Sequence, residues 1–138
     1  MIPWIFSTTK VEKVNFETIQ FARKNMAEYF IINTLSLQEQ DCLISGTVRA
    51  EKEEPTLNEM LQNSTSPDKK IIVYGKNSQD ETPYRKVSQL KGLGVKEVYV
   101  YTGGLFEWLL LQDIYGEKEF PTTTPLLDIL RHKYIEPS

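Results

Sequence analysis

The sequence predicts an α/β domain with a mostly parallel central sheet of about five strands and helices on both of its faces. Two apolar segments of strand type, residues 29–34 and 69–74, lack polar alternation, which is typical of strands buried on both faces. The stretch 98–108, VYVYTGGLFEW, passes from strand-forming residues through a glycine pair into an apolar helix. Strands and helices alternate from Tyr29 onward, and this alternation favours parallel strands.

Length and composition are those of an ordinary globular domain. The chain has 138 residues, of which 40% are hydrophobic and 25% are charged, and this is enough to form a core. We expect one domain over residues 1–138, with an N-terminal arm at 1–12 and a C-terminal tail at 117–138 that packs back on it. The 16 basic and 19 acidic side chains give a net charge of -3, so nucleic acid is not an expected partner.

Cys42 is the only cysteine, which excludes an intramolecular disulfide and a cysteine-based zinc cluster. We expect no metal, no cofactor and a reducing, cytoplasmic location. Residues 1–6 are apolar but lack a basic leader and a long apolar core, so they do not resemble a signal peptide. The most apolar run, 105–111, is much shorter than the ~20 residues that a membrane span needs. A soluble protein is predicted.

The first elements follow from capping and apolar spacing. Asn15 is expected to cap a helix that begins at Phe16, because its side-chain oxygen can accept from the first free amides. Arg23 and Lys24 place positive charge at the C-terminal end of this helix, where the helix dipole favours it. Residues 29–34 are then the first central strand.

The middle of the chain is expected to be mainly loop and helix. Residues 35–46 form a loop in which residues 42–44 turn inward, and residues 47–50 are a candidate short strand. Pro55 is expected in the first turn of a helix, where its missing amide is not needed. Residues 63–68, rich in turn formers, are the clearest loop.

The second half continues the alternation after the strand at 69–74. A helix is expected at 83–90 with Thr82 as its cap, followed by a strand at 97–101. An apolar helix spans about 105–115, and a last short helix is predicted near 125–130.

Two groups of apolar residues must be buried against other parts of the protein. The helix at 105–115 is apolar on nearly all sides, so it is either central or covered by the segment 120–125 folding back. Trp4, Ile5 and Phe6 are expected to pack within the domain, and packing against a partner chain is the alternative.

Four motifs occur in the order in which the rhodanese-like domain family has them. Residues 30–35 (FIINTL) resemble the family's Leu-Ile-Asp-x-Arg strand end, and residues 44–48 (ISGTV) resemble its His-Ile-Pro-Gly-Ala segment. Residues 71–75 (IIVYG) resemble the strand that leads to the family's active-site loop. The family's Gly-Gly-x-x-x-Trp signature is matched by Gly103, Gly104 and Trp108. The resemblance covers nearly the whole chain.

The resemblance implies a sulfurtransferase fold whose active-site loop begins with a cysteine, because a thiolate carries sulfur as a persulfide. Gly75 stands at that position. Backbone amides, often with a cation, normally stabilise an anion in this loop. Here the loop has Asp80 and Glu81, with Lys76 as its only cation. The strand-end acid and arginine are also replaced, by Asn33 and Leu35. The degenerate loop therefore consists of Gly75, Lys76, Asn77, Ser78, Gln79, Asp80 and Glu81.

Three other residues are candidates for chemistry. Ser78 is the only hydroxyl in the middle of the loop, but no base lies near it in the sequence; its alternative interpretation is a cysteine replaced as in a trapping variant. The single histidine, His132, is expected to be solvent-exposed or structural rather than catalytic. Cys42 is interpreted as a small buried hydrophobe, and the alternative is a relocated persulfide carrier.

These observations leave three hypotheses for function. The first is a catalytically degenerate rhodanese-like module with an interaction, regulatory or structural role, whose partner is another protein; membership of a larger assembly stays open. The second is a sulfurtransferase that uses Cys42. The third is a phosphatase-like descendant of the fold, ranked last because the loop lacks a cysteine and a convergent arginine, with Arg85 in the following helix.

Overall fold

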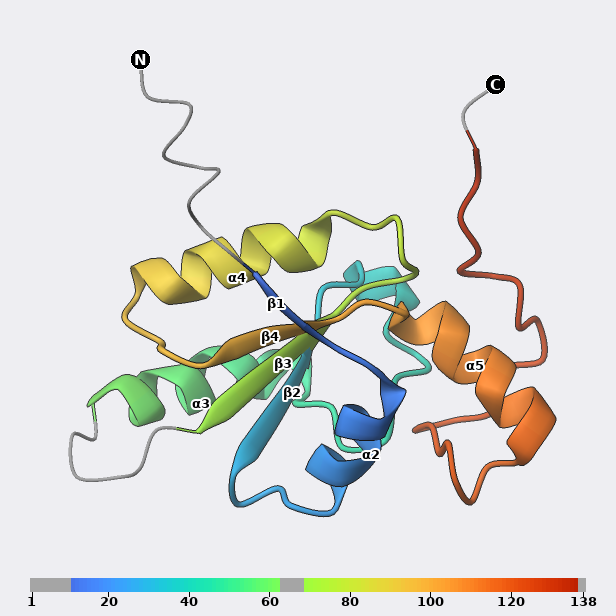
Figure 1. Ribbon diagram of the computed structural model, residues 1–138, viewed down its shortest axis with the longest axis horizontal. Coiled ribbons are helices and arrows are strands. Elements are labelled where there is room, and N and C mark those ends of the chain that lie inside the picture. Colours follow the sequence, from blue (N-terminus) through green and yellow to red (C-terminus); the bar gives the residue numbers. More distant parts are fainter. Residues whose placement is uncertain (1–10, 63–68, 137–138) are drawn as a thin grey trace.

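The computed structural model describes residues 11–62 and 69–136 (Figure 1). In chain order its elements are β1 (Glu12–Val14), α2 (Phe16–Arg23), β2 (Tyr29–Asn33), the 3₁₀ turn η1 (Leu37–Glu39), α3 (Ala50–Gln62), β3 (Lys70–Tyr74), α4 (Thr82–Gly92), β4 (Val98–Tyr101) and α5 (Gly104–Tyr115). The packing predicted for Trp4, Ile5 and Phe6 and the loop predicted at 63–68 lie outside the described residues.

The described strands form one parallel sheet in the order β1-β4-β3-β2. The predicted α/β fold is therefore confirmed, with four strands rather than about five. The candidate strand at 47–50 is wrong, because Thr47 forms only an isolated bridge to Ile31 and α3 begins at Ala50. Since all strands run the same way, the segments that follow β2, β3 and β4 meet at one edge of the sheet (Figure 1).

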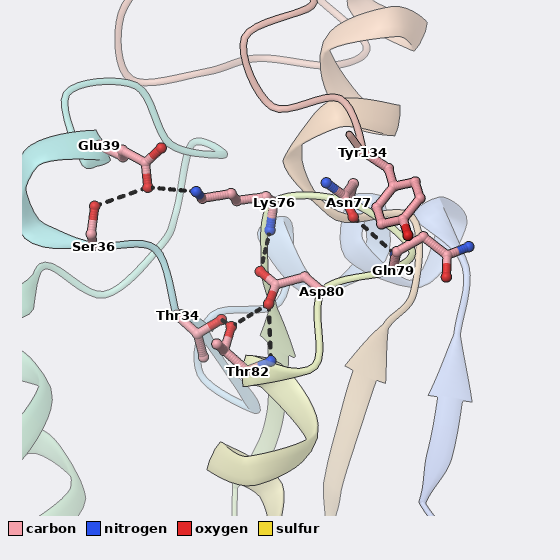
Figure 2. Close-up of a pocket in the computed structure, with 9 residues that line it drawn as sticks. All are labelled: Thr34, Ser36, Glu39, Lys76, Asn77, Gln79, Asp80, Thr82 and Tyr134. Atoms are coloured by element: carbon pink, nitrogen blue, oxygen red, sulfur yellow. Dashed lines mark hydrogen bonds and ion pairs between the residues drawn. The ribbon is translucent and has the colours of Figure 1, made fainter. Parts of the chain in front are cut away.

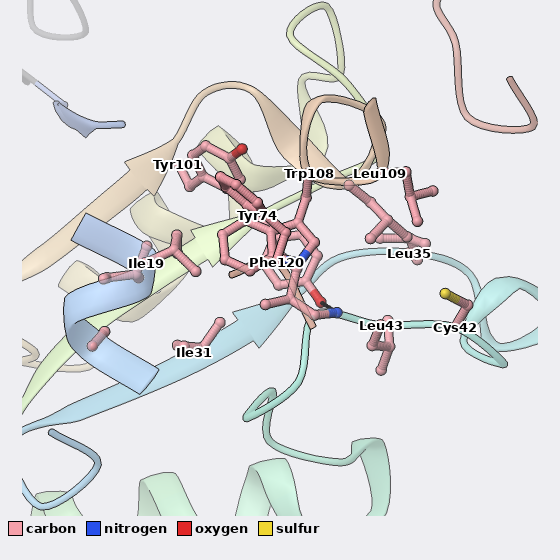
Figure 3. Packing of buried hydrophobic residues seen from close by; sticks show 14 of the residues in the cluster. Ile19, Ile31, Leu35, Cys42, Leu43, Tyr74, Tyr101, Trp108, Leu109 and Phe120 are labelled. Atoms are coloured by element: carbon pink, nitrogen blue, oxygen red, sulfur yellow. Dashed lines mark hydrogen bonds between the residues drawn. The ribbon is translucent and has the colours of Figure 1, made fainter. Parts of the chain in front are cut away.

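Helices cover both faces of the sheet, and β3 shows this directly. Ile71 and Val73 belong to the core cluster that contains residues of α3 and α4. Ile72 and Tyr74 belong to the other cluster, which contains residues of α2 and α5 (Figure 3). Successive side chains of a strand point to opposite faces, so an apolar run without polar alternation is buried on both.

Two helix starts show where local signals succeed and fail. Asn15 is the predicted cap of α2, and its Oδ1 accepts from the amides of Glu17 at 3.0 Å and Thr18 at 3.3 Å. The position predicted for Pro55 is wrong, because α3 begins at Ala50 and the proline lies inside the helix. Acidic residues near the start of a helix are favourable over the whole first turn, so they do not by themselves locate its first residue.

The segment after α5 folds back along the loop that precedes α3. The amide of Thr123 donates to the Leu43 carbonyl at 2.8 Å, and the amide of Ser45 donates to the Pro121 carbonyl at 3.0 Å. The short helix predicted near 125–130 is wrong, since the described residues 117–136 contain no helix. Just before that stretch, backbone groups of residues 121 and 123 bond to the loop that precedes α3.

Trp108 anchors α5 in the core. Its side chain is fully buried, its Nε1 donates to the Pro121 carbonyl at 3.0 Å, and its ring centroid lies 5.0 Å from that of Phe120 (Figure 3). The returning segment therefore covers part of α5, while Ile114 stays exposed. No helix in residues 11–62 and 69–136 is long and apolar enough to cross a membrane.

Candidate functional site

The loop of residues 75–81 joins β3 to α4 at the carboxyl edge of the sheet, and the N-terminus of α5 is bonded to it. The amide of Leu105 donates to the Gly75 carbonyl at 2.9 Å. The amide of Phe106 donates to the Lys76 carbonyl at 2.8 Å. These amides are among those that a helix leaves free at its start, so the loop backbone caps α5.

Gly104 permits this close approach. Its φ is +69°, in the left-handed region, and a Cβ added there would lie 2.7 Å from the backbone nitrogen of Asn77. Only glycine satisfies both conditions without strain. The second glycine of the Gly-Gly-x-x-x-Trp motif thus holds α5 against the loop, while Trp108 fixes the helix in the core.

The Asp80 carboxylate is the central acceptor of the loop (Figure 2). Its Oδ2 accepts from the Lys76 amide at 2.9 Å. Its Oδ1 accepts from the Thr82 amide at 2.9 Å and from the Thr82 hydroxyl at 2.8 Å. Partial burial raises the pKa of Asp80, but these hydrogen bonds and the charge of Lys76 outweigh it and hold the pKa below its usual value. Backbone amides that could hold an anionic ligand are therefore occupied by a side chain of the same loop.

Asp80 also fills the space beside Gly75. A Cβ added to Gly75 would lie 2.3 Å from Asp80 Oδ2 and 2.9 Å from Pro83 Cγ. Non-bonded atoms do not approach this closely, so any side chain at position 75 requires the carboxylate to move. The position at which the resemblance places a cysteine is thus sterically closed by Asp80.

Lys76, the cation of the loop, is held by a residue from another segment. Its Nζ lies 3.1 Å from Oε1 of Glu39, which also accepts from the Ser36 hydroxyl at 2.9 Å. Burial raises the pKa of Glu39, but the hydrogen bonds from Ser36 and Lys76 and the nearby positive charge lower it below its usual value. Figure 2 shows the Lys76 side chain directed at Glu39 rather than at Asp80.

These groups surround an open pocket of about 440 Å³ (Figure 2). The lining residues come from the end of β2, the following turn, the loop and the C-terminal segment: Thr34, Ser36, Glu39, Lys76, Asn77, Gln79, Asp80, Thr82 and Tyr134. Its charged side chains are one lysine and two carboxylates, which sum to -1. A pocket with this charge does not attract anions.

Polar groups at the end of β2 bond to other parts of the chain, except for the buried Nδ2 of Asn33, which has no partner among the described residues. The hydroxyls of Thr34 and Thr82 lie 2.7 Å apart. Asn33, at the position of the family's strand-end acid, is buried, and its Oδ1 accepts from the Leu35 amide at 3.0 Å. This side chain therefore stabilises the chain's own turn instead of reaching the pocket.

Ser78 is exposed at the loop and does not line this pocket. It lines a separate hollow of about 490 Å³ together with Glu81 and Arg85. The structure thus brings Ser78 close to an arginine of α4, as well as to carboxylates, but separates it from the space beside Gly75.

Cys42 is buried away from the loop, with 1% of its surface exposed. Its Sγ donates to the Thr124 carbonyl at 3.2 Å, and burial raises the pKa of the thiol. A protonated, enclosed thiol is a poor nucleophile. Figure 3 shows Cys42 at the margin of the cluster that contains Leu35 and Leu43.

His132, expected to be either solvent-exposed or structural, is buried. Only 1% of its surface is exposed, and its Nδ1 lies 4.0 Å from Oε2 of Glu39. Neither ring nitrogen has a hydrogen-bond partner among the described residues. Its backbone carbonyl accepts from the Asn77 side chain at 2.8 Å, so the C-terminal segment is tied to the loop. Sequence distance hid this contact, because the tail returns through tertiary packing.

His132 is expected to make folding stability depend on pH. Burial first, and the charge of Arg131 second, lower its pKa in the folded protein, so the unfolded chain binds the additional proton as the pH falls below about 6.5. Stability should therefore decrease as the pH falls from about 7 to about 5.5. Urea unfolding at both pH values checks this, with His132→Phe as the variant that removes the titration. An equal pH dependence in wild type and variant would contradict it.

Sequence reasoning missed the inward orientation of Asp80 and the presence of Glu39 and Tyr134 at the pocket. For Asp80 a signal exists, because an acidic residue just before a helix start can accept from its free amides. Glu39 and Tyr134 carry no local signal, since they reach the pocket from segments far from residues 75–81. Among the described residues, no group of three or more His, Cys, Asp or Glu side chains is placed to hold a metal ion.

Comparisons with known proteins agree with this architecture. The family model described as the rhodanese-like domain matches residues 24–111. A yeast protein described as a tyrosine phosphatase of the rhodanese family has a similar structure, with 17% identity, a TM-score of 0.61 and coverage of 89% of this chain and 99% of that one.

Two bacterial structures are similar as well. A full-length protein from Lactobacillus plantarum is 17% identical, with a TM-score of 0.57 and coverage of 82% of this chain and 88% of that one. The Alr3790 protein from Anabaena is 21% identical, with a TM-score of 0.55 and coverage of 85% and 84%. At these identities the likeness concerns the fold. No curated protein sequence matches the chain.

Proposed function

Because the chain belongs to the rhodanese-like domain family, we propose that it is a catalytically degenerate member whose loop and pocket form a protein-interaction surface. The observation that carries this proposal is the position of the Asp80 carboxylate. It fills the space beside Gly75 and accepts from the amides of Lys76 and Thr82. The nucleophile's place and the donors for an anion are therefore both taken.

The electrostatics of the loop support the same conclusion. Sulfur transfer through a persulfide requires stabilisation of a thiolate or a sulfur anion. Here the ionised Asp80 would repel such an anion, and Lys76 is paired with Glu39. Of the residues that line the pocket, Tyr134 is of a type enriched at protein interfaces, and the polar groups around it are of the kind found at an interface rim.

A thiosulfate-to-cyanide sulfur-transfer assay tests the proposal. We expect no thiocyanate above the uncatalysed rate, from either the wild-type chain or Cys42→Ser. Turnover that survives Cys42→Ser would contradict the proposal. Turnover that is lost in Cys42→Ser would instead establish the alternative, in which Cys42 carries the persulfide. The burial and raised pKa of Cys42 weigh against that alternative.

A phosphatase role has less support. Phosphoryl transfer by this kind of loop needs a nucleophile together with donors that neutralise the phosphate. Ser78 and Arg85 share a hollow, but Asp80 and Glu81 line the same hollow and oppose a phosphate. Hydrolysis of a small aryl phosphate that is abolished by Ser78→Ala would favour this role.

A further inference from the structure

The C-terminal segment passes beside the pocket and lines it through Tyr134, and we refer to residues 130–136 as the strap. The Arg131 guanidinium makes two hydrogen bonds to the Asp41 carboxylate, at 3.0 and 2.9 Å. The Asn77 side chain donates to the backbone carbonyl of His132 at 2.8 Å. Figure 2 shows the Tyr134 ring over the loop, beside Asn77 and Gln79. The strap thus contacts the site through a charge, a main-chain group and an aromatic ring.

These contacts are of the kinds that a bound peptide makes. A bidentate pair between arginine and a carboxylate gives geometric specificity, and a main-chain hydrogen bond sets the register of an extended segment. The strap also lies outside residues 24–111, which match the family model. It occupies the edge of the sheet where the loop lies.

Charge complementarity accompanies this arrangement. The strap carries Arg131, Lys133 and Glu136, a net charge of +1, whereas the surface beside it presents Asp41, Glu39 and Asp80 against the single cation Lys76. Arg131, which is bonded to Asp41, and Tyr134, which lines the pocket, are three positions apart, with His132 buried and Lys133 exposed between them. The sequence that occupies this groove is therefore an arginine, then a residue with a buried ring, then an exposed residue, and then an aromatic residue.

The strap is held at its middle by the buried His132 and is exposed on either side of it. Its ends are exposed, with 51% of Leu130 and 78% of Ile135 accessible. The ion pair between Arg131 and Asp41 is partly exposed, and exposed ion pairs contribute little to stability. By contrast, residues 121–123 are paired with the loop before α3, so the strap can open without detaching the rest of the segment.

We propose that the strap is a built-in occupant of a peptide-binding groove, and that a partner displaces it with an extended basic segment of the pattern Arg-His-x-aromatic, whose histidine takes the buried place of His132. The partner's arginine takes the place of Arg131 on Asp41, its main-chain carbonyl accepts from Asn77, and its aromatic ring takes the place of Tyr134. This inference rests on the proposed interaction role and names the chemistry of the partner and the regulation of the site.

The opening of the strap is measured by trypsin cleavage after Lys133 under native conditions, because a closed segment resists the protease. Arg131→Gln is expected to raise the cleavage rate about five-fold, since it removes the pair with Asp41. Arg49→Gln is the matched control, because it removes an exposed pair with Glu51 at the start of α3. Both variants are shown to be folded by circular dichroism. Equal cleavage rates in the two would contradict the role of Arg131 in holding the strap closed.

Binding in trans tests the groove itself. A labelled peptide of residues 128–136 is titrated by fluorescence anisotropy into full-length Arg131→Gln/Tyr134→Ala, whose own strap is weakened. We expect saturable binding that is weaker to the wild-type chain, where the strap competes. Replacing the peptide's arginine with glutamine, or Asp41 of the protein with asparagine, should weaken binding about ten-fold.

Two results would overturn the proposal. One is the absence of peptide binding to the folded double variant. The other is equal binding by the native peptide and its arginine-to-glutamine form, which would mean that Asp41 does not recognise the arginine. Both measurements are independent of sulfur transfer, so failure of the groove and failure of the proposed lack of catalysis are distinguished.

Discussion

Gly104→Ala is expected to lower the free energy of unfolding by about 4 kcal/mol. The new Cβ would lie 2.7 Å from the Asn77 nitrogen, and 2.9 Å from both the Asn77 Cα and the Gly75 carbonyl oxygen. All three are backbone atoms, so no side-chain rotation relieves the contact. Alanine must also adopt a φ of +69°, which adds left-handed strain. The loop would have to move away from α5, and the hydrogen bonds that Gly75 and Lys76 accept from α5 would weaken.

Gly94→Ala is the matched control for this prediction. Gly94 also has a positive φ, of +105°, but a Cβ added there meets nothing within 4 Å. It should therefore lose only about 1–2 kcal/mol, from backbone strain. Urea unfolding, followed by the fluorescence of the buried Trp108, gives both values. Equal losses of unfolding free energy at the two positions would show that the close approach at Gly104 does not affect stability.

Asp80→Ala is expected to destabilise the fold by about 2–3 kcal/mol, although an exposed acid in a loop ordinarily contributes little. The change removes the acceptor of the Lys76 amide and of both the amide and the hydroxyl of Thr82. Glu81→Ala, at an exposed neighbouring acid, should change stability by less than about 0.5 kcal/mol. Urea unfolding compares the two, and hydrogen exchange at the Lys76 amide should accelerate only in Asp80→Ala. Similar effects of both changes would contradict the central role of Asp80.

A double-mutant cycle with Gly75 sharpens this prediction. Gly75→Ala alone places a Cβ 2.3 Å from Asp80 Oδ2, and should cost about 2–3 kcal/mol. In the Asp80→Ala background that contact is gone, although Pro83 Cγ remains at 2.9 Å. The combined loss should therefore be smaller than the sum of the single losses by at least about 1 kcal/mol. Additive losses would mean that Asp80 does not occupy the space beside Gly75.

The roles of these residues explain how the loop of residues 75–81 keeps its conformation. An active loop of this fold presents donors to an anion that arrives from outside. In this chain Asp80 supplies the anion from within, so the loop keeps its backbone arrangement without a ligand. Gly75 leaves room for the Asp80 carboxylate, and Gly104 allows α5 to approach the loop backbone closely.

Much of the fold could be predicted because its signals are local or periodic. The apolar runs of β2 and β3, the Asn15 cap and the start of α5 at the glycine pair were all recognisable, and the structure confirms them. Errors arose where tertiary pairing overrides local preference. Residues 47–50 form one bridge and then helix, and residues 125–130 stay irregular, because the segment before them pairs with the loop that precedes α3.

The amino-acid sequence by itself determined the α/β class, the family resemblance and the absence of a cysteine from residues 75–81, because these depend on residue types and their spacing. Only the tertiary structure decided how the side chains of that loop are bonded. In the folded chain Asp80 points inward and Lys76 pairs with Glu39. His132 is buried, and Tyr134 lines the pocket. Such contacts join segments far apart in the chain, and they form only when packing brings those segments together, so no local pattern encodes them.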